Sequence, residues 1–372
     1  MIPEIDKCEL LNIFETILNV NSPSGSEEAI SDKIIDIVKE LQLEIITDAS
    51  IDKIKPNLIL KLPAYNSNNP ESILFSAHMD TVEPTEGIKI IKDSSIYKTD
   101  GSTILGADDK SGIAAILEAL FTLSRNNIPH PKIEVCFTVE EEIGLKGAKA
   151  LDFSLIESKI GFVLDCDGDV GKVVNAAPSQ INFKVAIHGK AAHAGVEPEK
   201  GKNAILFAGK AITSLPLGRI DPLTTTNIGT IHGGKATNIV PEIVELTGEM
   251  RSHNENTLNS LYEKFMKTFK NGENDGYIVE FSAEKNYSNF RIDENDPLIT
   301  LLKDTANDLD IPFKCMSSGG GSDANIFNKN STIKCVVLST GMEKVHTHDE
   351  YIKIDNLVAL TNWLIQIAYK RS

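Results

Sequence analysis

The feature that most constrains the fold is a series of short, branched apolar runs that alternate with helical patterns in the first half of the chain. Apolar residues recur at helical spacing over residues 10–20, 29–41 and 111–123. The short runs read as buried strands, since they are rich in Ile, Leu, Val and Phe. They are residues 57–60, 72–75, 133–137 and 160–164. This alternation predicts an α/β sheet.

The rhythm changes after about residue 180. The pattern becomes strand, helix, strand, strand, helix, strand, which is the split βαβ plan of a ferredoxin-like domain. Its elements are expected at residues 181–188, 204–215, 225–231, 243–250, 258–269 and 277–282. Helical and strand patterns then return at 297–309, 333–338 and 357–369. We therefore predict a discontinuous first domain, residues 1–178 and 287–372, with an α+β domain inserted at residues 179–286.

Composition narrows the classes of partner. The formal net charge of −16 disfavours nucleic acid and anionic membrane, since both are polyanions that need clustered Lys and Arg. The start of the chain has no signal-peptide pattern, and no run of 18 apolar residues occurs, so we expect a cytoplasmic protein. The five cysteines are odd in number and have no C-x-x-C spacing, which favours reduced thiols over disulfides or a thiolate zinc site. A small molecule or a short peptide is the expected substrate.

Acids and histidines follow the ends of several predicted strands. His78 and Asp80 come directly after the run 72–75, and being two apart on an extended segment they point to the same side. One can bind a metal while the other orients it. Asp165 follows the run 160–164, and open α/β sheets place their ligands at such strand ends.

Two further groups of acids lie at turns. Glu140, Glu141 and Glu142 follow the run 133–137, and three adjacent acids repel one another unless a bound cation balances them. Asp108 and Asp109 sit at a Gly-bounded turn that enters a helix. An ordinary helix N-cap is the alternative interpretation of these two aspartates.

A second histidine source lies far downstream, in the segment 345–351, where His346 and His348 are both candidates and a surface loop is the alternative. The full set combines two imidazoles with three carboxylates, which suits a pair of zinc or similar divalent ions. Its members are His78, Asp108, Glu142, Asp165 and His346.

Two other motifs do not hold. Residues 165–169 open like a calcium loop, but Val170 stands where the required Gly belongs and Ala176 where the bidentate Glu belongs. The glycine-rich segment 318–323 lacks the ending of a phosphate-binding loop, and Ala324 does not fit a serine nucleophile elbow. We expect this segment to be a turn that lines the substrate pocket.

With these motifs together, the sequence resembles the di-zinc family that includes peptidase T, carboxypeptidase G, acetylornithine deacetylase and succinyl-diaminopimelate desuccinylase. The resemblance spans nearly the whole chain, and within the family residues 106–112 and 141–148 look most like peptidase T and its shorter relatives. It also includes the early turn 22–25 and the spacing of His346 from Glu350, which selects His346 over His348.

The resemblance implies a zinc-peptidase-type catalytic domain with a mixed, mostly parallel sheet and an inserted lid domain. Asp108 would bridge two Zn²⁺ ions, for which Co²⁺ or Mn²⁺ could substitute. His78 and Asp165 would complete one site, and Glu142 and His346 the other. Glu141 would be the catalytic base. The peptide bond between Asp108 and Asp109 would be cis.

The inserted domain matches as well. His193, in the segment 187–195, would reach the active site of a neighbouring subunit and stabilise the oxyanion, which implies a homodimer through the lid. An exposed loop histidine is the alternative. Asn238, Arg251, Gly320 and Ser322 would contact substrate, the Arg being suited to a bidentate grip on a peptide carboxylate.

The activity implied is hydrolysis of an amide bond in a short peptide, by an aminopeptidase or tripeptidase. An N-acyl amino acid deacylase or a carboxypeptidase with the same metal centre stays open, because the motifs do not separate them. A binding protein that has lost the chemistry is a further alternative, but it should lack Glu141 or a ligand, and all are present. A structural metal site is disfavoured, since such sites use four Cys or His ligands.

Overall fold

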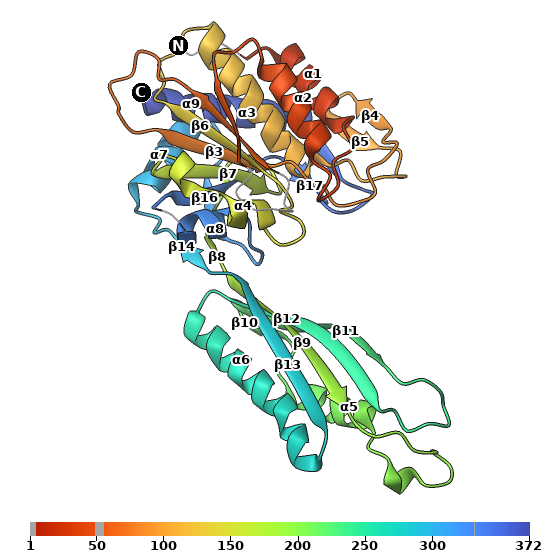
Figure 1. The fold of residues 1–372 in the computed structure, drawn as a ribbon. Helices are drawn as coiled ribbons and strands as arrows, with labels where there is room; N and C mark the ends of the chain where they lie inside the picture. Colours follow the sequence, from red (N-terminus) through yellow and green to blue (C-terminus); the bar gives the residue numbers. More distant parts are fainter. Residues whose placement is uncertain (1–4, 49–55, 331) are drawn as a thin grey trace. The chain divides into compact units, whose positions relative to one another are not determined.

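The computed structural model describes residues 5–48, 56–330 and 332–372. The chain forms two compact units (Figure 1). The first comprises Met1–Asn175, Arg291–Ser317 and Ser322–Ser372, and the second comprises Ala176–Phe290 with Ser318–Gly321. The predicted insertion at 179–286 lies inside the second unit. The segment Ser318–Gly321 groups with this unit too, whereas the sequence analysis places it in the catalytic domain.

The first unit is built on a mixed sheet, which confirms the α/β expectation. In the described residues the sheet has nine strands in the order β1-β2-β6-β3-β7-β16-β8-β14, with β15 pairing with β8. The strands are β1 (Glu44–Asp48), β2 (Asn57–Leu62), β3 (Ile73–His78), β6 (Ile133–Thr138), β7 (Ile160–Cys166), β8 (Lys172–Ala177), β14 (Phe290–Arg291), β15 (Lys314–Ser317) and β16 (Lys334–Ser339).

The centre of this sheet is parallel. β6, β3, β7 and β16 pair in parallel, while β1 with β2, β2 with β6 and β16 with β8 pair antiparallel. Every residue of β2, β3 and β6 is buried, as expected for strands covered on both faces. The carboxyl ends of the parallel strands therefore open at one edge of the sheet.

Helices cover this sheet on both sides. α3 (Ala107–Arg125) packs on β3 and β7 and against α1 (Lys7–Leu18) and α9 (Ile354–Lys370), while α8 (Asp323–Asn330) packs on β7 and β16 (Figure 1). The remaining helices of the unit are α2 (Glu28–Val38), α4 (Lys146–Ala150), α7 (Pro297–Asn307) and the 3-10 turn Phe153–Leu155.

The first turn of α3 comes close to β7. A Cβ atom on Gly112 would lie 2.9 Å from the main-chain oxygen of Leu164, so only glycine allows this approach. α3 is assigned from Ala107, but Asp108 and Asp109 have non-helical dihedral angles, so its regular part begins at Lys110, one residue before the predicted 111–123. This geometry places Asp108 beside the end of β7.

A smaller sheet, in the order β17-β18-β5-β4, pairs a segment near residue 350 with a segment near residue 95. Its strands are β4 (Ile90–Asp93), β5 (Ile96–Thr99), β17 (Met342–Glu343) and β18 (Tyr351–Lys353). The loop between β17 and β18 carries His346, so pairing of β18 with β5 fixes the base of that loop.

The second unit is an antiparallel sheet in the order β10-β11-β12-β9-β13. Its elements are β9 (Ser179–His188), α5 (Ala204–Ser214), β10 (Gly218–Asp221), β11 (Thr224–Gly233), β12 (Ile243–Ser252), α6 (Glu255–Lys270), β13 (Ile278–Tyr287) and the 3-10 turns Pro198–Lys200 and Asn271–Asp275. Apart from the edge strand β10, this is the predicted ferredoxin-like order.

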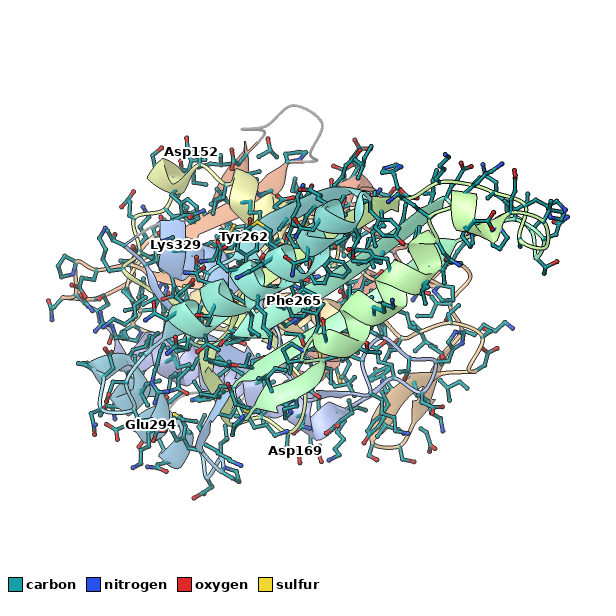
Figure 2. The ribbon with its side chains drawn as sticks, turned by 90° about the horizontal axis from the view of Figure 1, so that it is seen from below. Asp152, Asp169, Tyr262, Phe265, Glu294 and Lys329 are labelled. Atoms are coloured by element: carbon teal, nitrogen blue, oxygen red, sulfur yellow. The ribbon has the colours of Figure 1, made fainter. Side chains whose placement is uncertain are left out.

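The core of the second unit lies between the sheet and its two helices. α5 and α6 run side by side across one face of the sheet, where Phe265 of α6 is fully buried and Tyr262 is partly buried (Figure 2). Phe265 packs edge-on against Phe183 of β9. No helix among the described residues is both long and apolar enough to cross a bilayer.

Candidate metal centre

The strand order explains why residues far apart in the sequence meet. β3 lies between β6 and β7 and runs parallel to both, so His78 at the end of β3, Glu142 after β6 and Asp165 near the end of β7 share one edge. Asp108 reaches the same edge from the start of α3, and His346 from the β17–β18 loop.

Asp108 stands between the two histidines. Its Oδ1 lies 3.0 Å from Nε2 of His78, and its Oδ2 lies 3.1 Å from Nε2 of His346. Asp165 Oδ1 is 4.0 Å from the same nitrogen of His78, and Glu142 Oε1 is 2.9 Å from that of His346. Two groups that could hold a metal therefore share Asp108, namely His78–Asp108–Asp165 and Asp108–Glu142–His346.

The charges of this cluster are unbalanced. Burial raises the pKa of Asp165 well above its ordinary value, and the charge of Asp108 adds to the shift. Burial and the charge of Asp165 do the same to Glu141. The hydrogen bond to Asp108 is the main cause that raises the pKa of His346, to about 10. A pair of dications would offset the repulsion between the carboxylates and would take the place of the protons on the histidines. The residues therefore fit such ions.

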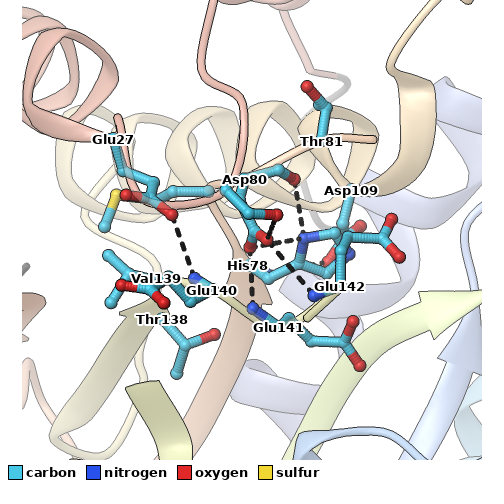
Figure 3. Close-up of polar contacts among 12 residues, drawn as sticks. Glu27, His78, Asp80, Thr81, Asp109, Thr138, Val139, Glu140, Glu141 and Glu142 are labelled. Atoms are coloured by element: carbon cyan, nitrogen blue, oxygen red, sulfur yellow. Dashed lines mark hydrogen bonds and ion pairs between the residues drawn. The ribbon is translucent and has the colours of Figure 1, made fainter. Parts of the chain in front are cut away.

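Asp80 contacts both His78 and the loop that carries Glu141 and Glu142. Nδ1 of His78 lies 2.8 Å from the main-chain oxygen of Asp80 and 3.4 Å from its carboxylate. The carboxylate instead accepts the main-chain N–H groups of Glu141, at 2.9 Å, and Glu142, at 3.2 Å (Figure 3). Asp80 therefore fixes the imidazole ring and the glutamate-bearing loop together.

The sequence pattern of the peptidase family M20/M25/M40 matches residues 74–370, well over half of the chain. The chain belongs to this family. The resemblance predicted from the sequence motifs is thus confirmed. Since the match includes the segment that supplies all five predicted metal ligands, the cluster is the candidate active site of an M20 metallopeptidase.

Several proteins are similar over almost their full length. An uncharacterised protein of Bacillus subtilis strain 168, YqjE, is 39% identical over 367 residues, 98% of each chain. The structure of aminopeptidase PepT from Bacillus cereus ATCC 10987 superposes with a TM-score of 0.92, at 38% identity and 99% coverage of both chains. A tripeptidase from Staphylococcus aureus Mu50 superposes with a TM-score of 0.95, at 36% identity and 99% coverage of both.

The geometry separates His348 from the metal cluster but leaves two roles open for Glu141. Nδ1 of His348 lies 2.7 Å from the main-chain oxygen of Gly101, and this histidine joins neither metal group above. Glu141 forms a further possible metal group with His78 and Glu142, so its place in the structure is compatible with either a base or a ligand. The Asp108–Asp109 peptide bond is cis, as the resemblance implies.

Three buried acids support the cluster through hydrogen bonds. Glu350 accepts main-chain N–H groups of Leu105, at 2.9 Å, Gly106, at 2.8 Å, and Asp108, at 3.1 Å. Asp109 accepts the N–H of His78 at 3.3 Å and that of Gly112 at 3.2 Å, the latter being the helix-capping role given as the alternative. The third acid, Asp323, accepts the hydroxyl of Thr138 at 2.5 Å. In the sequence, Glu350 had a signal in its spacing from His346 and Asp109 in its place before a helix, whereas Asp323 had none.

The other predicted residues lie outside this cluster. His193 and Asn238 are exposed in the second unit, where the N–H of Ala194 donates to the main-chain oxygen of Asn238 at 2.9 Å. Arg251 and Gly320 also belong to the second unit, and Ser322 is buried in the first.

Proposed function

We propose that this protein is a metal-dependent aminopeptidase that removes the N-terminal residue of short peptides, tripeptides among them. The observation that carries the proposal is the position of Asp108, whose two oxygens each face a different histidine and so can bridge two ions. The aminopeptidase and tripeptidase structures that match almost the whole chain support the choice of substrate. Zinc suits the mixed nitrogen and oxygen ligands, and Co²⁺ or Mn²⁺ could replace it.

The ligands would divide into two sets. His78 and Asp165 would hold one ion and Glu142 and His346 the other, with Asp108 shared. Bound ions would polarise the scissile carbonyl and lower the pKa of water from about 15.7 towards about 7. Glu141 would take the proton of the attacking water and pass it to the leaving amine. Asp80 would keep Glu141 in place through its bond to the main-chain N–H.

The proposal extends to His193. The N–H of Gly195 donates to Nδ1 of His193 at 3.2 Å, so the neutral ring carries its proton on Nε2. An exposed Nε2–H is the donor that a developing oxyanion needs. We propose, as the resemblance implies, that His193 acts on the active site of a partner subunit. This requires a homodimer, and sedimentation of the metal-loaded protein would detect the dimer.

Arg251 is the residue that we propose for binding the carboxylate end of the substrate. Its Nε and Nη2 donate to Glu249, at 3.0 and 2.9 Å, and its Nη1 donates to the main-chain oxygen of Gly319 at 3.3 Å. A guanidinium has five N–H donors, so two are left over from these three bonds within the described part of the chain. We propose that these bind the carboxylate end of the peptide, with Asn238, Gly320 and Ser322 lining the substrate site.

A substrate panel tests the function. The zinc-loaded and cobalt-loaded protein would be incubated with free-amine di-, tri- and tetrapeptides, the same peptides with an acetylated N-terminus, and N-acetyl and N-succinyl amino acids. We expect cleavage of the first bond of free-amine peptides only, and none with the Glu141→Ala variant. Turnover of blocked substrates alone would replace the aminopeptidase by a deacylase or carboxypeptidase.

A further inference from the structure

Three consecutive main-chain N–H groups after β6 point at two carboxylates. The N–H of Glu140 donates to Oε1 of Glu27 at 3.0 Å, and those of Glu141 and Glu142 donate to Asp80 at 2.9 and 3.2 Å (Figure 3). Successive N–H groups of this kind form a concavity that favours anions. We call residues 139–145, which include Glu141 and Glu142, the glutamate loop. These three main-chain N–H groups of the loop are therefore held by the side chains of Glu27 and Asp80.

Glu27 lies two residues after the early turn, residues 22–25, whose motif belongs to the family resemblance but has no role in the chemistry above. Glu27 is 1% exposed, and the N–H of Gly25 in the same turn also donates to its Oε1, at 2.8 Å. Ser24 donates its hydroxyl to Asp80 at 2.6 Å, and Ser22 donates its hydroxyl to the main-chain oxygen of Met79 at 2.9 Å. The turn is thus fastened to the end of β3 and, through Glu27, to the glutamate loop.

The conformation of the glutamate loop needs such support at its first residues. Glu140 has φ 50°, a left-handed conformation that residues other than glycine rarely adopt. Its main-chain oxygen accepts the N–H of Lys146 at 3.1 Å, and its carboxylate pairs with Nζ of the same lysine at 2.8 Å. The buried N–H of Glu140 has Glu27 as its partner. Removal of that carboxylate would leave the N–H unpaired and remove a bond that holds Glu140 in its strained conformation.

We propose that Glu27 is a positioning residue of the metal centre, which sets the glutamate loop so that Glu142 meets His346 and Glu141 faces the reacting water. The inference rests on the proposed function. It differs from a general stabilising role, because a misplaced loop weakens metal binding and catalysis more than it weakens folding.

The chain offers a matched control at the other end of β6. Glu134 is fully buried and accepts the main-chain N–H groups of Glu157, at 2.9 Å, and Ser158, at 2.8 Å. It is therefore also a buried carboxylate that ties a loop to β6, but it lies away from the metal ligands. Glu134 also accepts the hydroxyl of Ser158 at 2.6 Å and pairs with the buried Nζ of Lys61 at 3.4 Å, so Glu134→Ala gives an upper limit to what loss of a carboxylate that accepts main-chain N–H groups does to the fold alone.

The experiment measures zinc and cobalt affinity of the chelator-stripped protein by competition with a coloured chelator, with no substrate present. We expect Glu27→Ala to bind metal about 10- to 100-fold more weakly than the wild type, as for lost outer-shell partners of metal ligands. Glu27→Gln keeps an oxygen for both N–H groups and should stay within about threefold. Glu134→Ala should lower the melting temperature but leave the affinity within about threefold.

Kinetics of the metal-loaded variants give a second readout, in which Glu27→Ala should lower kcat with little change in KM. Unchanged metal affinity and kcat in Glu27→Ala, an equal loss in Glu134→Ala, or no rescue by Glu27→Gln would each overturn the proposal. If Glu27→Ala does not fold, Glu27→Asp takes its place, because its carboxylate is set back by one methylene. Its metal affinity and kcat are then compared with those of Glu27→Gln. If the wild type binds metal but cuts no peptide, the proposed function fails, while the affinities still decide the role of Glu27.

Discussion

A buried carboxyl group on the central helix α3 makes a testable prediction about stability. Glu118 is 1% exposed, and its Oε1 accepts the hydroxyl of Thr122 at 2.9 Å. Its Oε2 has no hydrogen-bond partner among the described residues. Burial raises the pKa of Glu118 from 4.5 to about 7, although the bond from Thr122 works in the opposite direction. The ionised form is therefore unfavourable in the folded protein.

The sign and size of the effect follow from linkage. Below pH 4.5 the group is protonated in both states and contributes nothing. Between pH 4.5 and 7 the folded state binds more protons than the unfolded state, so the free energy of unfolding falls as the pH rises. At 1.36 kcal/mol per pH unit, the penalty reaches about 3 kcal/mol above pH 7. Glu118→Gln removes the ionisation, so it should stabilise the protein by about 3 kcal/mol at pH 8 and by under about 1 kcal/mol at pH 5.

The assay is urea unfolding in chelator at pH 5 and pH 8, followed by fluorescence. The chain has one tryptophan, Trp363, which is fully buried on α9 and donates its indole N–H to Thr305 of α7, so the signal reports on the first unit. Glu86→Gln, at an exposed position, controls for the change of net charge. If the wild type and Glu118→Gln differ in unfolding free energy by the same amount at both pH values, the reasoning is wrong.

The remaining predictions concern the metal centre and its substrate. Glu141→Gln should keep two metal ions per chain by equilibrium dialysis but lower kcat by about 10²- to 10⁴-fold, and loss of an ion would make this residue a ligand instead. His346→Ala should lose one ion, whereas His348→Ala should keep both, and the reverse result would exchange the two histidines. Arg251→Ala should raise KM for a tripeptide about tenfold or more but leave that for its C-terminal amide nearly unchanged, since only the former offers a carboxylate. Removal of the metals with a chelator should abolish peptide cleavage, and added zinc should restore it.

The sheet and the metal cluster could be predicted because their signals are local. Buried strands are short runs of branched residues, and parallel strands bring the acids at their ends to one edge. The predicted runs 133–137 and 160–164 became β6 and β7, and Glu142 and Asp165 meet the histidines there. The short edge strand β10 lacks such a signal, since most of its residues are exposed.

The supporting contacts could not be read from the sequence, because they join segments far apart in the chain. Glu27 is 113 residues from Glu140, and Glu350 is 242 residues from Asp108. Glu27 and Glu350 each accept a main-chain N–H with a side-chain oxygen. Nearly every residue type has such an N–H, so the sequence gives no sign of the donor. For the same reason the sequence predicts Asp80 as a catalytic residue that orients His78, but not its bonds to the glutamate loop.

The strand order also determines when the enzyme can become active during synthesis. β16 lies between β7 and β8 in the sheet, yet it follows the whole second unit in the chain. A nascent chain that ends before β16 leaves one edge of β7 unpaired, and exposed strand edges invite wrong pairing. It also lacks His346. Synthesis of residues 334–346 therefore completes this part of the sheet and supplies the proposed ligand His346, so a nascent chain that stops before them would lack both.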